Sequence, residues 1–187
     1  MSNTQNRRRV AVFGTLRIMT ISALLCAMSI VLGKYLAIRG GEVLRFSFEN
    51  LPILLAGMAF GPIVGAAVGV VADLVGCLLV GYAINPIVTV GAALIGLSSG
   101  VCYHWLKKLP IGARVVLSVG LAHLLGSVLV KTVGLAAFYD MPLGILMLWR
   151  LLNYAIVGAL EALLLIAILK NRALARLIRI ETERRPK

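Results

Sequence analysis

Residues 43–100 read VLRFSFENLPILLAGMAFGPIVGAAVGVVADLVGCLLVGYAINPIVTVGAALIGLSSG. From position 50 to position 100 the only charged side chain is that of Asp73, in a run long enough for more than two membrane-spanning helices. A carboxylate at membrane depth is costly unless it faces a partner or a water-filled cavity. The stretch therefore predicts a helical bundle inside a membrane, with a polar pocket near Asp73.

The composition of the whole chain agrees with this interpretation. Hydrophobic residues make up 60% of the 187 residues and charged residues only 14%, which excludes an ordinary soluble domain. The length accommodates roughly six spans of about 20 residues each, with little chain left over. We therefore expect an all-α, multi-pass protein of the cell membrane, with a single six-helix domain over residues 1–170 and a basic tail over 171–187.

Hydropathy and turn signals place the spans, and the basic residues orient them. The six predicted spans are 15–36, 49–60, 62–82, 86–106, 112–137 and 144–169, and Gly61-Pro62 ends the short second one. Basic clusters precede the first span, lie between the fourth and fifth, and follow the sixth. Because positive charge concentrates on the cytoplasmic side, this six-transmembrane-helix bundle is predicted to have both termini in the cytoplasm.

The predicted outer loop between the first two spans alternates aromatic and polar side chains. Arg45, Phe46, Ser47 and Phe48 follow a Gly-Gly pair at positions 40 and 41. Alternation of this kind is typical of extended backbone. The pattern indicates a lid over a pocket that opens to the outside.

Further polar residues at the outer ends of spans indicate a negatively charged ligand. Lys131 and Arg150 lie at the depth of the loop, with Asn153 one turn after Arg150. An arginine offers a planar fork to a carboxylate, and a lysine offers a point charge. Asn85 belongs to the same outer surface, although an Asn-Pro turn alone also explains it. Asp73 either contacts the ligand or forms an internal ion pair with Lys131 or Arg150, and Lys131 alone is also explained by snorkelling.

Other conspicuous residues have structural interpretations. His123, on an apolar helix, is expected to be a satisfied interior histidine, and Glu161 is expected to pair with an arginine or a partner protein. Small residues recur every fourth position, which favours close packing of helices within the bundle. These are Gly57, Gly61, Gly65 and Gly69.

No enzyme motif accompanies the pocket. The sequence has no Walker loop, no G-x-S-x-G, no metal-spaced histidine cluster and no paired intramembrane carboxylates, so we expect no catalytic residue, metal or cofactor. A small bundle with a pocket and no nucleotide site either binds passively or depends on other subunits to drive transport.

Two motifs give the chain a resemblance to a known family. Residues 23–27 read ALLCA, and residues 49–76 read ENLPILLAGMAFGPIVGAAVGVVADLVG. The second motif contains Leu-Pro, Gly-Pro, Gly-xxx-Gly and Ala-Asp-Leu features. Over nearly its whole length the chain resembles the S-components of energy-coupling-factor vitamin transporters, and the folate family most.

The resemblance implies a binding subunit that captures a vitamin outside the cell and hydrolyses no ATP itself. Its partners would be a transmembrane coupling protein, contacted through Ala23 and Ala27, and two cytoplasmic ATPase subunits. Folate is the implied substrate. Its pterin ring can stack between Phe46 and Phe48, and the N–H edge of the ring suits the carboxylate of Asp73 or the amide of Asn85. The carboxylates of its glutamate part suit the cations Arg45, Lys131 and Arg150.

Residues 84–94 read INPIVTVGAAL, where many folate-family members have a Phe-Pro-Gly-Phe-Thr type sequence. Because the difference lies at the predicted mouth of the pocket, another vitamin such as pantothenate stays open as the substrate. A small membrane enzyme or a scaffold is the alternative from another functional class.

Overall fold

The computed structural model describes residues 2–40, 44–139 and 142–171, with side chains from Leu16 onward except at 38–45 and 139. The predicted basic tail falls, apart from Asn171, outside the described residues. The elements are α1 (Ser2–Ile30), η1 (Val31–Tyr35), β1 (Ile38–Gly40), β2 (Leu44–Phe46), α2 (Asn50–Phe60), α3 (Pro62–Val80), α4 (Pro86–Trp105), α5 (Ile111–Ala122), η2 (His123–Val130), α6 (Lys131–Tyr139) and α7 (Leu143–Lys170). The segments η1 and η2 are π-helical.

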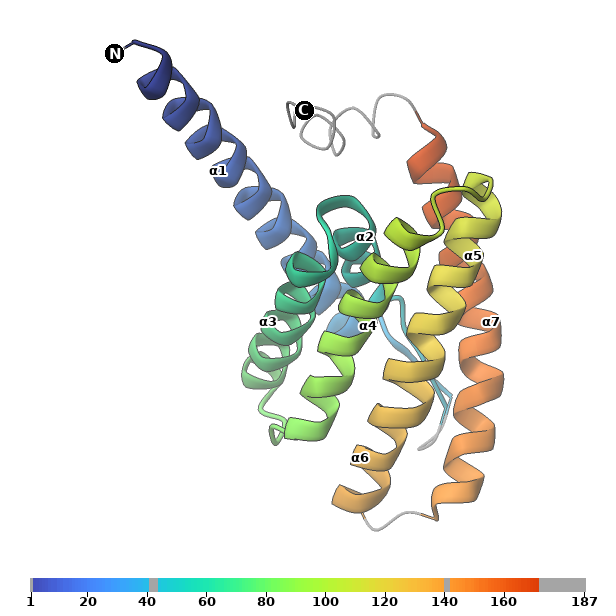
Figure 1. The fold of residues 1–187 in the computed structure, drawn as a ribbon. Helices are drawn as coiled ribbons and strands as arrows, with labels where there is room; N and C mark the ends of the chain where they lie inside the picture. The colour runs from blue at the N-terminus through green and yellow to red at the C-terminus, as the bar shows by residue number, and fades with distance from the viewer. Residues whose placement is uncertain (1, 41–43, 140–141, 172–187) are drawn as a thin grey trace.

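Among the described residues, five helical segments are long and apolar enough to cross a membrane. They are Leu16–Tyr35, Pro62–Val80, Pro86–Trp105, Ile111–Phe138 and Leu143–Lys170. These match five of the predicted spans to within a few residues. The fifth predicted span consists of α5, η2 and α6, which continue one another (Figure 1).

The second of the six predicted spans, α2, is an apolar helix that is shorter than the other five. Its 11 residues extend about 16 Å, which is roughly half of the ~30 Å hydrocarbon core. Residues 50–58 of this helix are buried, so α2 is a half-length helix inside the bundle. It begins deep within the protein and leads to the turn at Gly61 (Figure 1).

The turns have the local chemistry that the sequence indicated. Gly61 has φ 103°, a conformation open to glycine, and Pro62 begins α3 at a position where proline is well tolerated. Pro86 begins α4 in the same way, directly after Asn85. The chain therefore reverses direction at both positions predicted from the sequence.

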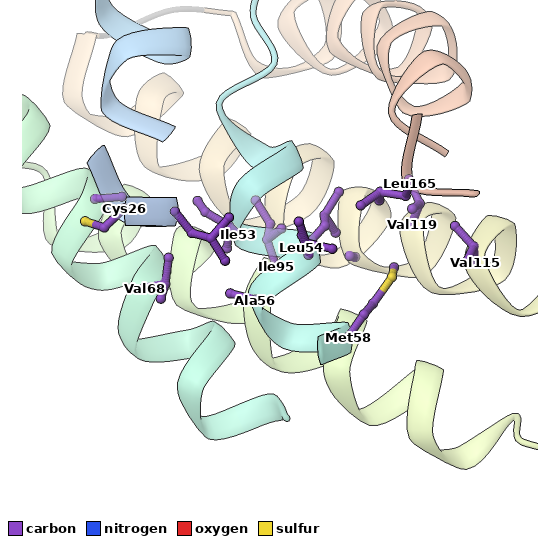
Figure 2. Packing of buried hydrophobic residues seen from close by; sticks show 14 of the residues in the cluster. Cys26, Ile53, Leu54, Ala56, Met58, Val68, Ile95, Val115, Val119 and Leu165 are labelled. Carbon is purple, nitrogen blue, oxygen red and sulfur yellow. The ribbon is translucent and has the colours of Figure 1, made fainter. Parts of the chain in front are cut away.

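Three of the four regularly spaced glycines lie where α2, α3 and α4 pack closely. A Cβ atom at Gly65 would lie 2.6 Å from both the Cα of Gly57 and the carbonyl oxygen of Gly96, and Gly69 faces the backbone of Ala92. The predicted packing role is thus confirmed. The adjoining core brings together Leu54, Ile95 and other side chains from α2, α4, α5 and α7 (Figure 2).

The predicted extended segment forms a small antiparallel ribbon. Strands β1 and β2 pair with Arg39 opposite Arg45 in register. Strand β2 lies near α7. The all-α prediction therefore holds for the described residues apart from this ribbon, which precedes the buried start of α2.

Candidate functional site

A small cavity of about 20 Å³ lies where α1, η1, α3, α4 and α6 surround the start of α2. We call it the charged cavity. Its lining residues are Ser29, Ile30, Lys34, Glu49, Ile53, Ala72, Asp73, Ala92 and Lys131. A volume of this size holds about one water molecule. The lining side chains must therefore move before a larger ligand can enter.

An ion pair crosses the cavity. The Nζ of Lys131, the first residue of α6, lies 3.4 Å from Oε1 of Glu49. The side chain of Lys131 is 5% exposed and that of Glu49 is 22% exposed. The hydroxyl of Ser29 donates a hydrogen bond to the backbone oxygen of Glu49 at 2.6 Å. Helices α1 and α6 thus both hold the residue that precedes α2.

Asp73 contacts a hydroxyl. Its Oδ2 accepts a hydrogen bond of 2.7 Å from Thr89 of α4. The ion pair that the sequence analysis considered, with Lys131 or Arg150, does not occur among the described residues, because Lys131 pairs with Glu49. Asp73 therefore presents a carboxylate to the cavity without a cationic partner bonded to it in the described chain.

Lys34 is the second cation of the cavity. Its Nζ lies 3.9 Å from Sγ of Cys77 and 5.5 Å from the centre of the Tyr82 ring. The attraction of an ammonium group to an aromatic ring is modest compared with an ion pair in a dry site. Among the described residues no carboxylate forms a salt bridge with Lys34, so its charge is available to an anion.

Three charged side chains of the cavity each pack against a glycine of a neighbouring segment. A Cβ atom on these glycines would lie 2.6 to 2.8 Å from the charged side chain. At that distance the charged side chain or the backbone of the glycine would have to move. The pairs are Gly33 with Glu49, Gly76 with Lys34 and Gly91 with Lys131. Because glycine has no side chain, these three positions leave the space through which the charged side chains reach the cavity.

Asn85 joins helices at the edge of the site. Its Oδ1 accepts hydrogen bonds from the backbone N–H groups of Ile87 at 3.0 Å and Val88 at 3.4 Å, which caps α4. Its side-chain amide donates to the backbone oxygen of Gly134 in α6 at 2.8 Å. These bonds give Asn85 a structural task, as the turn interpretation expected.

The other predicted ligand residues lie away from the charged cavity. On α7, Nη2 of Arg150 donates to the hydroxyl of Tyr154 at 3.2 Å, and Asn153 is buried. Phe46 at the end of β2, and Ser47 and Phe48 in the connection to α2, are half-buried.

Arg45 lies in β2, and its side chain is outside the described residues. The structure thus brings Asp73 and Lys131 together and distributes the remaining predicted residues over the ribbon, the α3–α4 turn and α7.

Glu161 has a different partner from the one expected. Its Oε2 lies 2.6 Å from Nε2 of His123, whose Nδ1 lies 3.2 Å from the hydroxyl of Ser127. The His123 ring stacks on Tyr154 with centroids 4.9 Å apart. The prediction of an arginine or protein partner was wrong, because α7 presents Glu161 to η2. The prediction of a satisfied interior His123 was correct.

Ala23 and Ala27 are exposed on α1. They share a face of the helix, because residues four apart lie one above the other. In contrast, Cys26 between them is buried against the core. The two alanines therefore form a flat, small-residue surface that the bundle itself does not cover.

Four polar residues of the site were not among the ligand residues predicted from the sequence: Ser29, Lys34, Glu49 and Thr89. A signal existed for Lys34, a cation at the predicted outer end of the first span, where the usual charge bias opposes it. Glu49 lies within the motif that carried the family resemblance. No spacing rule linked either residue to the cavity.

Comparison with known proteins gives three matches. Residues 17–172 match the family model described as "ECF transporter, substrate-specific component". The "Folate transporter FolT" of Clostridium novyi (strain NT) is 26% identical over 155 residues, which cover 79% of this chain and 85% of that protein. A solved structure, "Crystal structure of FolT bound with folic acid", is similar with a TM-score of 0.64 and 26% identity, over 78% of this chain and 87% of that one.

Proposed function

This chain belongs to the substrate-specific components of ECF transporters, and we propose that its substrate is folate, bound at the charged cavity and the adjoining outer loop. The observation that carries the proposal is the cluster of Lys34, Glu49, Asp73 and Lys131 inside a multi-pass membrane protein. Ionisable groups at membrane depth mark binding or transport sites. The similarity to the folate transporter and to the folate-bound structure supports this choice of substrate.

The chemistry of the cluster suits both ends of folate. The pterin ring presents N–H donors, for which the carboxylates of Asp73 and Glu49 are matching acceptors. The glutamate part carries two carboxylates, and Lys34 is the cavity cation without a carboxylate partner in the described chain. We assign Lys131 a second role: it exchanges its bond with Glu49 for one with the ligand.

The remaining predicted residues complete the proposed site on its outer side. Phe46 and Phe48 would stack on the pterin, with Ser47 between them. Arg45, Asn85, Arg150 and Asn153 would contact the more polar part of the ligand.

Binding requires the cavity to enlarge, because sites for drug-sized ligands measure roughly 300–1,000 Å³. The part expected to move is the first turn of α2 together with Glu49, the residue that precedes it. Glu49 is bonded to Ser29 and Lys131, and its side chain is 22% exposed, so a ligand can reach it.

The first experiment is a titration of the purified protein with a vitamin panel that contains folate and pantothenate. Fluorescence of Trp149, next to Arg150, and thermal stabilisation serve as readouts. We expect folate to bind most tightly and Lys34→Met to weaken it, while Lys107→Met, in the exposed α4–α5 turn, leaves the affinity unchanged. Binding of pantothenate without binding of folate would show that the substrate is pantothenate and not folate. Absence of binding to every vitamin would favour the enzyme or scaffold alternative.

We further propose that both termini face the cytoplasm and that the chain assembles with a transmembrane coupling protein and two ATPase subunits. Folate would be delivered into the cell at the expense of ATP hydrolysed by those subunits. Ala23 and Ala27 would contact the coupling protein, since their exposed small side chains allow a second helix to approach closely.

The substitution Ala27→Trp tests the coupling surface. It should leave folate binding intact and abolish uptake in cells that contain the complete transporter. The control is Leu117→Trp, at a half-exposed apolar position of α5. Uptake at the wild-type rate in the Ala27→Trp protein would refute this surface.

A further inference from the structure

A second, larger concavity lies between α5 and η2 on one side and α7 on the other. Its volume is about 600 Å³. It runs from Val116 to Val128 along the first wall and from Leu151 to Ile166 along the second. We call it the α5–α7 groove. It shares no lining residue with the charged cavity.

Small side chains create the groove. A Cβ atom at Gly120 would meet nothing within 4 Å, and Ala155, Gly158 and Ala159 line the opposite wall. The groove therefore has free space next to Gly120 that a larger side chain would fill.

The walls of the groove offer almost no free polar group. His123 and Tyr154 are the lining residues with strongly polar atoms. The ring nitrogens of His123 bond Ser127 and Glu161, and the Tyr154 hydroxyl accepts a bond from Arg150. The surface available to an occupant is consequently hydrocarbon and ring faces, which suits an apolar ligand.

The length and position of the groove match a lipid chain. Val116 to Val128 corresponds to about 18 Å along a helix, close to the ~15 Å hydrocarbon depth of one leaflet. Both walls belong to segments long enough to cross the membrane (Figure 1). Val116, Leu151 and Leu163 are about half exposed or more, so these walls face the bilayer in a membrane.

A cation stands beyond one end of the groove. Lys170 follows the lining residue Ile166 by four positions and therefore lies on the same face of α7. Its side chain is exposed, at the last residue of the helix. An ammonium group near the end of an apolar groove complements the phosphate of a phospholipid whose chain enters the groove.

We propose that the α5–α7 groove binds one acyl chain of a phospholipid whose phosphate contacts Lys170. The bound chain fills the space next to Gly120 and supports the contact between α5 and α7 beside the His123–Glu161 pair. This site is independent of the proposed folate site.

The test measures binding of palmitoyl-oleoyl-phosphatidylglycerol to the full chain in detergent by native mass spectrometry. In Gly120→Leu the new side chain occupies the groove, and the apparent dissociation constant of the one-lipid adduct should rise by about tenfold or more, since exclusion of two methylenes suffices. The matched control is Gly144→Leu on α7, where a Cβ atom also meets nothing within 4 Å but which does not line the groove. This control should change the constant less than about twofold.

Two further variants test the acyl-chain site and the phosphate contact separately. Ala159→Leu fills the same groove from α7 if Gly120→Leu fails to fold, and retained folate binding demonstrates folding in either case. Lys170→Gln should weaken the lipid adduct by about fivefold. Unchanged binding in Lys170→Gln would overturn the phosphate contact.

Unchanged lipid binding in both groove-filling variants would overturn the acyl-chain site. If those variants instead abolish a dimer of this chain, or its assembly with the coupling protein, and leave the lipid adduct intact, the groove is a protein interface and the proposal is wrong.

Discussion

Two polar pairs inside this bundle, Lys131–Glu49 and His123–Glu161, differ in geometry and surroundings. Lys131 and Glu49 are 3.4 Å apart beside the charged cavity, with the Glu49 side chain 22% exposed. His123 and Glu161 are 2.6 Å apart, with side chains 5% and 0% exposed. The first pair is long and partly accessible, whereas the second is short and enclosed.

The elements that carry the pairs explain the difference. Glu49 lies between the ribbon and a half-length helix, and its side chain is 22% exposed. His123 and Glu161 lie in the middle of two long helical segments that pack side by side (Figure 1). We infer that the first pair can be exchanged for a ligand, while the second braces the bundle. Substitutions in the two pairs and their surroundings separate these two roles.

The largest effect is expected from Glu161→Ala. The change leaves the buried Nε2 of His123 without its partner and creates a cavity at a fully buried position, which together cost about 3–5 kcal/mol. We expect this loss in unfolding experiments in detergent, with folate affinity nearly unchanged in the protein that remains folded. The double variant His123→Leu/Glu161→Leu should recover most of the stability. A large loss of folate affinity with normal stability would reverse the assignment of the two pairs.

Lys131→Met should affect ligand binding more than stability. Truncation of a buried, hydrogen-bonded charge costs about 2–5 kcal/mol of binding free energy, or roughly 30-fold to 1,000-fold or more in the dissociation constant. Isothermal titration with folate measures it. Lys108→Met, at an exposed turn position, is the control. Equal affinities for the two variants would exclude Lys131 from the site.

Gly91→Ala tests whether the glycines position the charges. Its Cβ would lie 2.6 Å from Cγ of Lys131 and 2.9 Å from the backbone oxygen of Gly126. Overpacking of this kind costs about 1–3 kcal/mol, and displacement of Lys131 should weaken folate binding by about tenfold. The control is Gly120→Ala, where the added atom meets nothing within 4 Å. A similar affinity in both proteins would contradict the positioning role.

Ser29→Ala should have the smallest effect. It removes the 2.6 Å hydrogen bond to the backbone of Glu49, which is worth about 0.5–1.5 kcal/mol. Because that bond holds the start of α2, we expect a several-fold change in folate affinity. Ser118→Ala, whose hydroxyl bonds the backbone of its own helix at Arg114, should leave affinity unchanged. A larger stability loss in Ser118→Ala than in Ser29→Ala, with equal affinities, would assign Ser29 to general packing.

Much of the fold was predictable from the sequence because its signals are local. The lengths of the apolar runs placed five membrane-spanning segments, and Gly61-Pro62 and Asn85-Pro86 placed two turns. The glycine spacing correctly indicated close packing. The half-length α2 was the exception, since an apolar run of 11 residues has the same composition whether it crosses a membrane or ends inside a bundle.

The sequence by itself determined the class of the protein, its helices and its family, because composition and motifs are properties of contiguous residues. Only the tertiary structure decided which polar side chains meet: Lys131 with Glu49, 82 positions away, and His123 with Glu161, 38 positions away. In a soluble helix the polar face reveals its orientation, but a membrane helix is apolar toward lipid and toward its neighbours alike. The rotation of each helix, and therefore the partner of each buried charge, follows from packing.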